Sequence, residues 1–176
     1  QPKSIVEDVL VLPYGDSEKC EALLRHHSDE LACLIMEPVS SNFGYLPAPL
    51  KFLQLMRSLT SELGIMLIFD EVQSFRIAPG GAQEFFNVIP DLTTLGKVIG
   101  GGLPVGAFGG TNELMSLYDP TSDGGVKIPH AGTFNANPMT MVAGQVVMNH
   151  LTENSYTKMN QLGDILRHKL ESVFDE

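Results

Sequence analysis

The 176-residue sequence has few cysteines, few basic residues and no long apolar run. Its two cysteines, Cys20 and Cys33, are too few for a disulfide framework or a cysteine zinc site. Cys33 lies in an apolar run, so we expect a small buried residue in a reducing compartment. No apolar stretch approaches the roughly 20 residues of a membrane-spanning helix, and no charged-then-apolar leader opens the chain. We therefore expect a cytoplasmic protein without a membrane partner.

Basic side chains are scarce relative to acidic ones, 11 against 21, and the formal net charge is −10. This balance argues against the backbone of a nucleic acid as the main partner, although local groups can still bind a small anion. With 43% hydrophobic and 18% charged residues, the chain is not of a disordered class. It does not begin with Met and starts in the middle of a pattern, so we expect a fragment or a processed product.

Short apolar runs alternate with helical patterns along the chain. The runs 31–36 and 65–69 predict strands covered on both faces, and 93–95 and 105–108 are shorter strand candidates. This alternation predicts an α/β fold with a mostly parallel sheet flanked by helices. In such sheets ligands bind at the carboxyl ends of the strands, which here carry Glu37, Asn42, Asp70 and Lys97.

Proline, asparagine and glycine mark the expected helix ends. A helix introduced by Pro47 and Pro49 has apolar residues at helical spacing and a stop at Gly64. A second helical pattern begins at Asn137-Pro138, where Asn caps and Pro occupies the first turn. It continues to the end of the chain with a break expected near 152–155.

Asp70 follows five apolar residues and therefore stands at the mouth of the predicted sheet, where a carboxylate needs a partner. It is a candidate ligand-binding residue; a helix cap or a structural ion pair is the alternative. Glu71 points the opposite way on an extended chain. The two acids are therefore unsuited to act as a glycosidase pair.

Lys97 lies in a glycine-rich, otherwise apolar stretch that ends in Gly100-Gly101-Gly102. Glycines let another group approach the backbone, and a lysine in an apolar pocket is a usable amine nucleophile. The alternative is an ordinary surface lysine. The spacing fits neither a phosphate-binding loop nor a dinucleotide fingerprint.

Two further groups of residues have side chains or backbone groups that can bind ligands. Gly132 and Thr133 precede a predicted helix, so their backbone N–H and hydroxyl suit a phosphate oxygen; a plain turn is the alternative. His26, His27 and His130 do not have the spacing of zinc ligands. No metal is expected.

In this order, these segments resemble the class-III aminotransferases, which are pyridoxal 5′-phosphate (PLP) enzymes of fold type I. Within that family the resemblance is to glutamate-1-semialdehyde 2,1-aminomutase and its relatives. The matching stretches are 35–39, 67–73, 81–83, 90–107 and 130–138. The resemblance implies that residues 1–150 are part of the PLP-binding large domain, and that 151–176 form a helix leading toward a small domain that is absent.

The resemblance also implies roles for individual residues. Lys97 would form the Schiff base with PLP and move a proton, and Asp70 would pair with the pyridine nitrogen. Val72 would pack on the ring, and Asn42 and Gln73 would hydrogen-bond near its phenolic oxygen. Gly132 and Thr133 would hold the phosphate of the neighbouring subunit, which implies a homodimer with a shared cofactor site.

Two departures from the family pattern are visible. Ser74 runs directly into Phe75-Arg76 without the usual glycine, and His130 with 134–136 suits the relatives of the aminomutase better than the aminomutase itself. Three hypotheses follow: an aminotransferase or aminomutase acting on a small amino or carbonyl substrate, a truncated non-catalytic α/β module, or an unrelated nucleotide-binding domain. The failed nucleotide spacings speak against the third.

Overall fold

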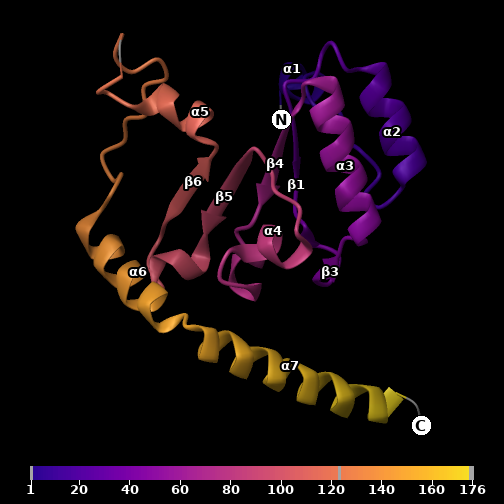
Figure 1. The fold of residues 1–176 in the computed structure, drawn as a ribbon, viewed down its shortest axis with the longest axis vertical. Helices are drawn as coiled ribbons and strands as arrows, with labels where there is room; N and C mark the ends of the chain where they lie inside the picture. Colours follow the sequence, from indigo (N-terminus) through magenta and orange to yellow (C-terminus); the bar gives the residue numbers. More distant parts are fainter. Residues whose placement is uncertain (1, 123, 175–176) are drawn as a thin grey trace.

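The computed structural model describes residues 2–122 and 124–174 of the chain. Figure 1 shows an open sheet with helices beside it and one long helix that extends away from it. The predicted domain ranges, 1–150 and 151–176, include positions 1, 123, 175 and 176, which lie outside the described residues. The helices and strands, in chain order, are α1 (Lys3–Glu7), α2 (Ser17–His26), β1 (Cys33–Met36), β2 (Val39–Ser40), β3 (Leu46–Pro47), α3 (Leu50–Leu63), β4 (Met66–Asp70), η1 (Ser74–Ile77), α4 (Gly81–Phe86), β5 (Leu92–Gly96), η2 (Lys97–Gly100), β6 (Gly106–Gly110), α5 (Asn112–Met115), η3 (Ser116–Tyr118), α6 (Pro138–His150) and α7 (Glu153–Phe174).

The main sheet has the strand order β1-β4-β5-β6, and β2 and β3 form a small hairpin. β1, β4 and β5 are parallel, whereas β6 runs antiparallel to β5. The predicted α/β class with a mostly parallel sheet is therefore confirmed. In register, Asp70 of β4 lies beside Thr94 of β5, and Gly96 of β5 lies beside Gly106 of β6.

Local signals explain the ends of the two helices predicted from the sequence. At the end of α3, Gly64 adopts φ 70°, the left-handed conformation that closes a helix at little cost for glycine. At the start of α6, the side chain of Asn137 accepts hydrogen bonds from the backbone of Met139 and Thr140. The expected interruption of the C-terminal helical pattern is found at residues 151–152, between α6 and α7.

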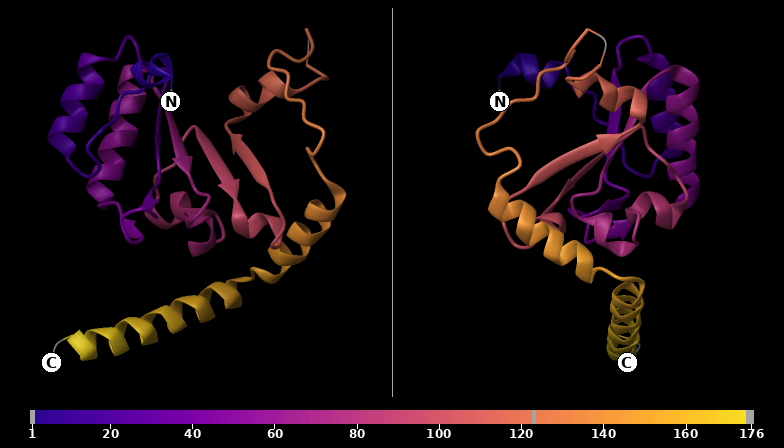
Figure 2. Two further views of the ribbon diagram at one scale, coloured as in Figure 1. Left: turned by 180° about the vertical axis from the view of Figure 1, so that it is seen from behind. Right: turned by 60° about the vertical axis from the view of Figure 1, so that its left-hand side comes forward.

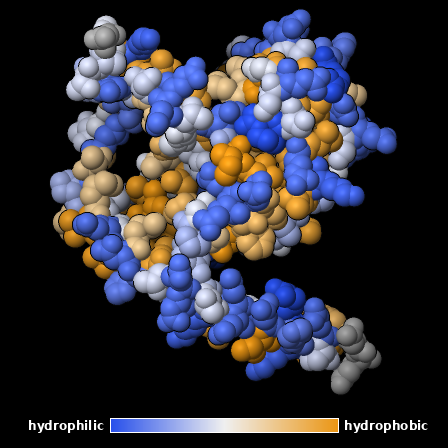
Figure 3. All heavy atoms as spheres, viewed as in Figure 1, coloured by the Kyte–Doolittle hydropathy of each residue, from blue (hydrophilic) through white to orange (hydrophobic). Residues whose placement is uncertain are grey.

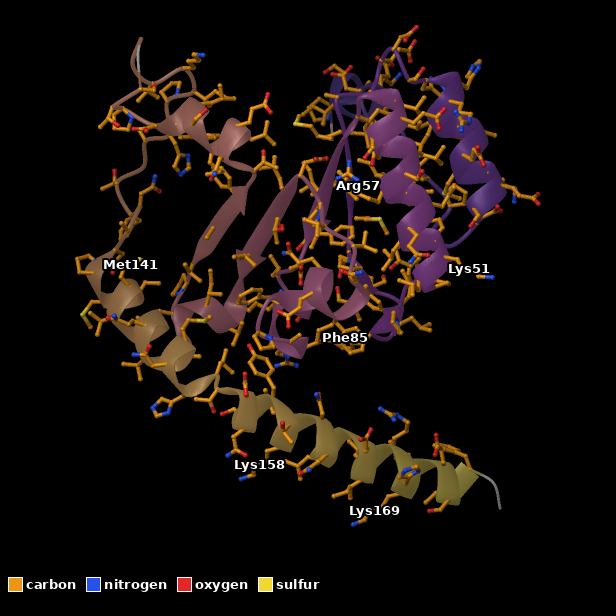
Figure 4. All side chains as sticks on the ribbon, viewed as in Figure 1. Lys51, Arg57, Phe85, Met141, Lys158 and Lys169 are labelled. Carbon is orange, nitrogen blue, oxygen red and sulfur yellow. The ribbon has the colours of Figure 1, made fainter. Side chains whose placement is uncertain are left out.

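The hydrophobic core lies between α2, α3 and one face of the sheet. Phe69, Leu67 and Leu53 are fully buried there. Figure 2 shows α2 and α3 packed together on one side of the strands. Beside the start of β5, the Arg57 guanidinium donates to the Asp91 carboxylate at 3.0 Å, and Figure 4 shows this arginine pointing from α3 toward the strands.

Two expectations about the first strand were wrong. Cys33 is exposed rather than buried, and Ile35 on the same face of β1 is 58% exposed. The physical reason is the alternation of side chains along a strand: Leu34 and Met36 turn toward the core, and Cys33 and Ile35 turn toward the face that no described helix covers. The apolar run is therefore covered on one face only.

Candidate functional site

The candidate site lies where β4 and β5 end side by side. Because the two strands are parallel neighbours, their carboxyl ends meet at one edge of the sheet (Figure 1). β4 ends at Asp70 and β5 ends at Gly96, the residue before Lys97. The sheet thus brings the two principal predicted residues, Asp70 and Lys97, to the same edge.

Asp70 is half-buried, and its Oδ1 accepts a hydrogen bond from the Val72 backbone at 3.0 Å. Burial alternates along this stretch: Leu67, Phe69 and Glu71 are buried, whereas Asp70 is not. Asp70 and Glu71 therefore differ in environment as the extended chain predicts. Asp70 retains acceptor capacity at the edge of the sheet.

Val72 lies against the end of β5. A Cβ atom built on Gly96 would meet both Val72 methyl groups at 3.4 Å, so the absent side chain at 96 lets Val72 approach the strand. Gln73 is half-buried and immediately precedes η1. The structure thus brings Asp70, Val72 and Gly96, the residue before Lys97, to the same edge of the sheet.

Lys97 begins η2 in an unusual backbone conformation, with φ 46°. Non-glycine residues rarely adopt this region, and such strained positions cluster at functional sites. The expected apolar pocket around Lys97 is not found, because this residue is exposed. Lys97 stands beyond the last strand pair, and both residues of that pair, Gly96 and Gly106, lack side chains to cover it.

The turn that carries Lys97 is packed against α6 through glycines. A Cβ atom on Gly144 would come within 2.2 Å of the Ile99 carbonyl oxygen, and one on Gly101 within 2.4 Å of the Ala143 carbonyl oxygen. The Thr140 hydroxyl also donates to the Pro104 carbonyl at 3.4 Å. The backbones of α6 and of the turn that carries Lys97 are therefore in close contact, and α6 supports η2.

Asn42 lies further along the same edge of the sheet. It is exposed in the turn between β2 and β3, which follows β1. The Glu37 carboxylate accepts from the Ser41 backbone at 2.9 Å and so anchors the start of this turn. Asn42 thus shares the edge, but no recorded hydrogen bond joins it to Asp70 or Lys97 among the residues described.

Gly132 and Thr133 are exposed and lie in an irregular segment between η3 and α6. They do not sit directly before the helix, because a turn closed by the Asn135 and Asn137 backbones separates them from α6. The following residues, 134–137, line a hollow together with 104–106, at the start of β6. Gly132 and Thr133 therefore belong to the β6 side of the edge, and no described contact joins them to Lys97.

His130, which precedes Gly132 and Thr133, belongs to an aromatic cluster. Its ring lies edge-on to Phe108 of β6 at 5.5 Å between centroids, and 6.2 Å from that of Tyr118. The cluster holds the beginning of the 130–137 segment against β6. Within 2–122 and 124–174, no three His, Cys, Asp or Glu side chains are grouped so that they could hold a metal ion.

Glu71 is a functional candidate that the sequence reasoning did not select. It is fully buried and accepts hydrogen bonds from Ser74 Oγ and from the backbone of Ala82 and Gln83. The signal in the sequence that could have pointed to Glu71 is the alternation of inward and outward side chains, which continues one residue past the end of β4. The partners at 82 and 83 come from α4 and only the fold reveals them.

None of the helices in the described ranges has the length and apolar character needed to cross a membrane. A family model described as aminotransferase class-III matches residues 6–176. The chain belongs to the class-III aminotransferase family, whose members use PLP.

Individual relatives support the same family. Glutamate-1-semialdehyde 2,1-aminomutase of Limosilactobacillus reuteri is 44% identical over 176 residues, covering 99% of this chain and 40% of that protein. The crystal structure of an omega-transaminase from Sphaerobacter thermophilus is 48% identical with a TM-score of 0.94, covering 98% of this chain and 39% of that one. A transaminase with PLP bound is 36% identical with a TM-score of 0.91, covering 97% and 40%. The chain thus spans about 40% of the length of these relatives.

Proposed function

We propose that this chain forms the cofactor-binding part of a PLP-dependent enzyme that transfers amino groups. The observation that carries the proposal is the placement of Lys97 and Asp70 at the ends of two adjacent parallel strands, with Lys97 in a left-handed backbone conformation. A solved relative with PLP bound shares this fold. The site and the family together support this proposal.

The residues at the edge suit PLP by their chemistry. Lys97 offers an exposed amine, and Asp70 offers a carboxylate with free acceptor capacity. Cβ atoms built on Gly102 and Gly106 would meet nothing within 4 Å, so the space beside Lys97 is open. When bound, PLP supplies an electron sink that stabilises negative charge on the substrate carbon.

Each residue would then act in a defined way. The Lys97 amine would hold the cofactor covalently and later carry a proton, and Asp70 would keep the ring nitrogen protonated. Val72, which already lies over Gly96, would pack on the ring. Asn42 and Gln73 would donate hydrogen bonds near the phenolic oxygen.

The phosphate would be held across a subunit boundary. Gly132 and Thr133 lie on the β6 side of the edge and, in this proposal, bind the phosphate of the neighbouring subunit of a homodimer. Closed two-fold dimers are the commonest homo-oligomers. Light scattering with and without PLP tests this assembly, and a strict monomer in both conditions would count against it.

The substrate is proposed to be a small amino or carbonyl compound. The relatives bear both an aminomutase name and a transaminase name, and Lys97 and Asp70 serve both reactions. Product analysis separates them: formation of 5-aminolevulinate from glutamate-1-semialdehyde without an added amino donor identifies the aminomutase. Dependence on a donor identifies the aminotransferase.

The second candidate function is that of a non-catalytic α/β part of such an enzyme. On this candidate the chain folds but retains no PLP. The division into a large-domain part, 1–150, and a helix toward a small domain, 151–176, remains a proposal of the same kind, as does a cytoplasmic location. An absorbance scan after gel filtration with PLP distinguishes the two functions.

Lys97→Ala is the decisive variant for the proposed function. We expect it to abolish covalent attachment of PLP and leave the fold intact, because the exposed Lys97 side chain contributes little packing. Borohydride reduction of the PLP-loaded chain followed by peptide mapping measures the attachment. The exposed Lys51 of α3 is the internal control, and label there instead of at Lys97 would refute the assignment.

Asp70→Asn is expected to retain PLP but to weaken catalysis. Neutral asparagine does not stabilise a protonated ring nitrogen, so the loss should fall on the proton-transfer step, which positioned groups accelerate by about 10²–10⁴-fold. Single-turnover kinetics together with the bound-cofactor absorbance measure the two effects separately. Unchanged turnover would show that Asp70 is structural.

A further inference from the structure

The end of β4 is held by a buried carboxylate that the proposed reaction does not use. Glu71 is 0% exposed, and both of its carboxylate oxygens accept hydrogen bonds. Oε2 accepts from Ser74 Oγ at 3.2 Å and from the Ala82 backbone, and Oε1 accepts from the Gln83 backbone at 3.1 Å and its side-chain amide at 3.2 Å. All of these partners donate, which suits an ionised carboxylate.

The donors come from two separate pieces of chain, and one of them also contacts a third. Ser74 belongs to η1, Ala82 and Gln83 belong to α4, and the Gln83 amide also donates to Thr93 of β5 at 3.1 Å. A Cβ atom on Gly81 would lie 2.5 Å from Glu71 Oε2, so α4 approaches the carboxylate through a glycine. Glu71 therefore ties β4, η1, α4 and β5 together at one buried point.

The Glu71 backbone belongs to the same junction. Its N–H donates to the Thr94 carbonyl at 3.0 Å, and its carbonyl accepts from the Phe75 backbone at 3.0 Å. Glu71 stands between Asp70 and Val72, and its side chain fixes which way the chain faces there. Because side chains alternate, a buried Glu71 turns Asp70 toward the open edge of the sheet.

We infer that Glu71 is a positioning residue for Asp70, which it orients toward the cofactor by anchoring the chain between Asp70 and Val72. The inference rests on the proposed function. Removing the negative charge of Glu71 without changing its shape loosens this junction. The effect on the cofactor passes through Asp70, since no donor or acceptor of Glu71 lies on the open face.

Glu71→Gln is the variant that tests this inference. Each carboxylate oxygen accepts from a backbone N–H, so either orientation of the glutamine amide places an NH₂ group against a backbone donor. No side-chain flip relieves the mismatch. The outer partners that orient ligand side chains in metal sites alter affinity or activity by about 10–100-fold. We expect Glu71→Gln to slow the proton-transfer step by a factor near the low end of that range and, like Asp70→Asn, to retain PLP.

Asp91→Asn supplies the matched control at the other end of the same strand. The Asp91 carboxylate accepts from the Leu67 backbone at 2.7 Å and from Arg57, so this variant also loosens β4 but away from Asp70. Hydrogen exchange followed by mass spectrometry reports both junctions without cofactor. We expect faster exchange in 71–75 and 82–83 for Glu71→Gln, and around 67 and 91 for Asp91→Asn.

The cofactor readout is the pH titration of the visible absorbance of the PLP-loaded full chain. We expect Glu71→Gln to shift the midpoint of this titration in the same direction as Asp70→Asn does. Asp91→Asn should leave the midpoint unchanged. The double variant at 70 and 71 should have the same midpoint as Asp70→Asn alone. Additive shifts, or unchanged exchange in 71–75, would overturn the inference. A wild-type chain that attaches no PLP at Lys97 overturns the proposed function itself, and the inference with it.

Discussion

The two halves of the chain are held together by different means. From α2 to α4 the molecule has large buried side chains, and the whole hydrophobic core cluster lies between Cys20 and Val88. Among the residues described from η2 onward, Tyr156 is the only apolar residue that is buried. Figure 3 shows apolar side chains at the surface around α6, where Met141, Val142 and Val146 are exposed.

The candidate site lies at the boundary between these halves. Asp70 is carried by β4, whose buried face belongs to the core, whereas Lys97 is carried by a turn held by close contacts between glycine backbones. Burial of large side chains provides most of the free energy of folding. The half with Asp70 is thus firmly anchored, and the position of Lys97 depends on the fit between η2 and α6.

The largest expected change in stability comes from Phe69, and Phe134 in the other half is its comparison. Phe69→Ala should lower the free energy of unfolding by about 3–5 kcal/mol, because Phe69 is fully buried in the core. Phe134→Ala, at a residue that is 81% exposed, should change it by about 0.5 kcal/mol or less. Denaturant titration measures both, and similar losses would break the contrast between the halves.

The glycine contact between η2 and α6 is expected to give the next largest effect. Gly144→Ala forces a methyl group against the Ile99 carbonyl and should cost about 1–3 kcal/mol. Gly163→Ala in α7 meets nothing within 4 Å and should instead stabilise its helix by up to about 1 kcal/mol. Thermal unfolding followed by circular dichroism distinguishes the two; equal effects would show that α6 does not support η2.

The smallest effect is a pH dependence in the anchored half. Burial, with the nearby charge of Glu37, raises the pKa of Tyr14 to about 12, and its hydroxyl donates to the Glu37 carbonyl at 2.7 Å. The folded state therefore holds the proton more tightly than the unfolded state, whose tyrosine titrates near 10. This contribution to stability is complete below pH 10 and is lost as pH rises from about 10 to 12.

Tyr14→Phe isolates that contribution. The difference in unfolding free energy between wild type and Tyr14→Phe should be constant below pH 10 and shrink above it, because phenylalanine does not titrate. Denaturant titrations at several pH values measure the difference. A constant difference up to pH 12 would place Tyr14 in water rather than against the core.

Local signals in the sequence predicted a good part of the fold. Asn137-Pro138 and Gly64 act within one turn of a helix, so their positions alone specified where α6 begins and α3 ends. The parallel strands followed from apolar runs, which placed Asp70 and Lys97 at the same edge. These features depend on neighbours in the chain and are visible without the fold.

Other features depend on contacts between distant residues and were not predictable in this way. Cys33 shares its apolar run with buried residues, but its exposure depends on which face the helices cover. Glu71 meets donors 11 and 12 residues away in the chain. Lys97 stands exposed beyond the last strand pair, and the two members of that pair, Gly96 and Gly106, are ten positions apart and have no side chains to cover it.

The left-handed backbone conformation at Lys97 lowers stability at the residue on which the proposed chemistry depends. A residue with a side chain pays about 1–2 kcal/mol to adopt this conformation, and glycine does not. A glycine at position 97 would therefore relax the turn while removing the amine on which the proposed chemistry depends. Selection for thermal resistance alone would favour loss of the lysine, so its presence in a strained turn is what one expects where chemistry outweighs stability.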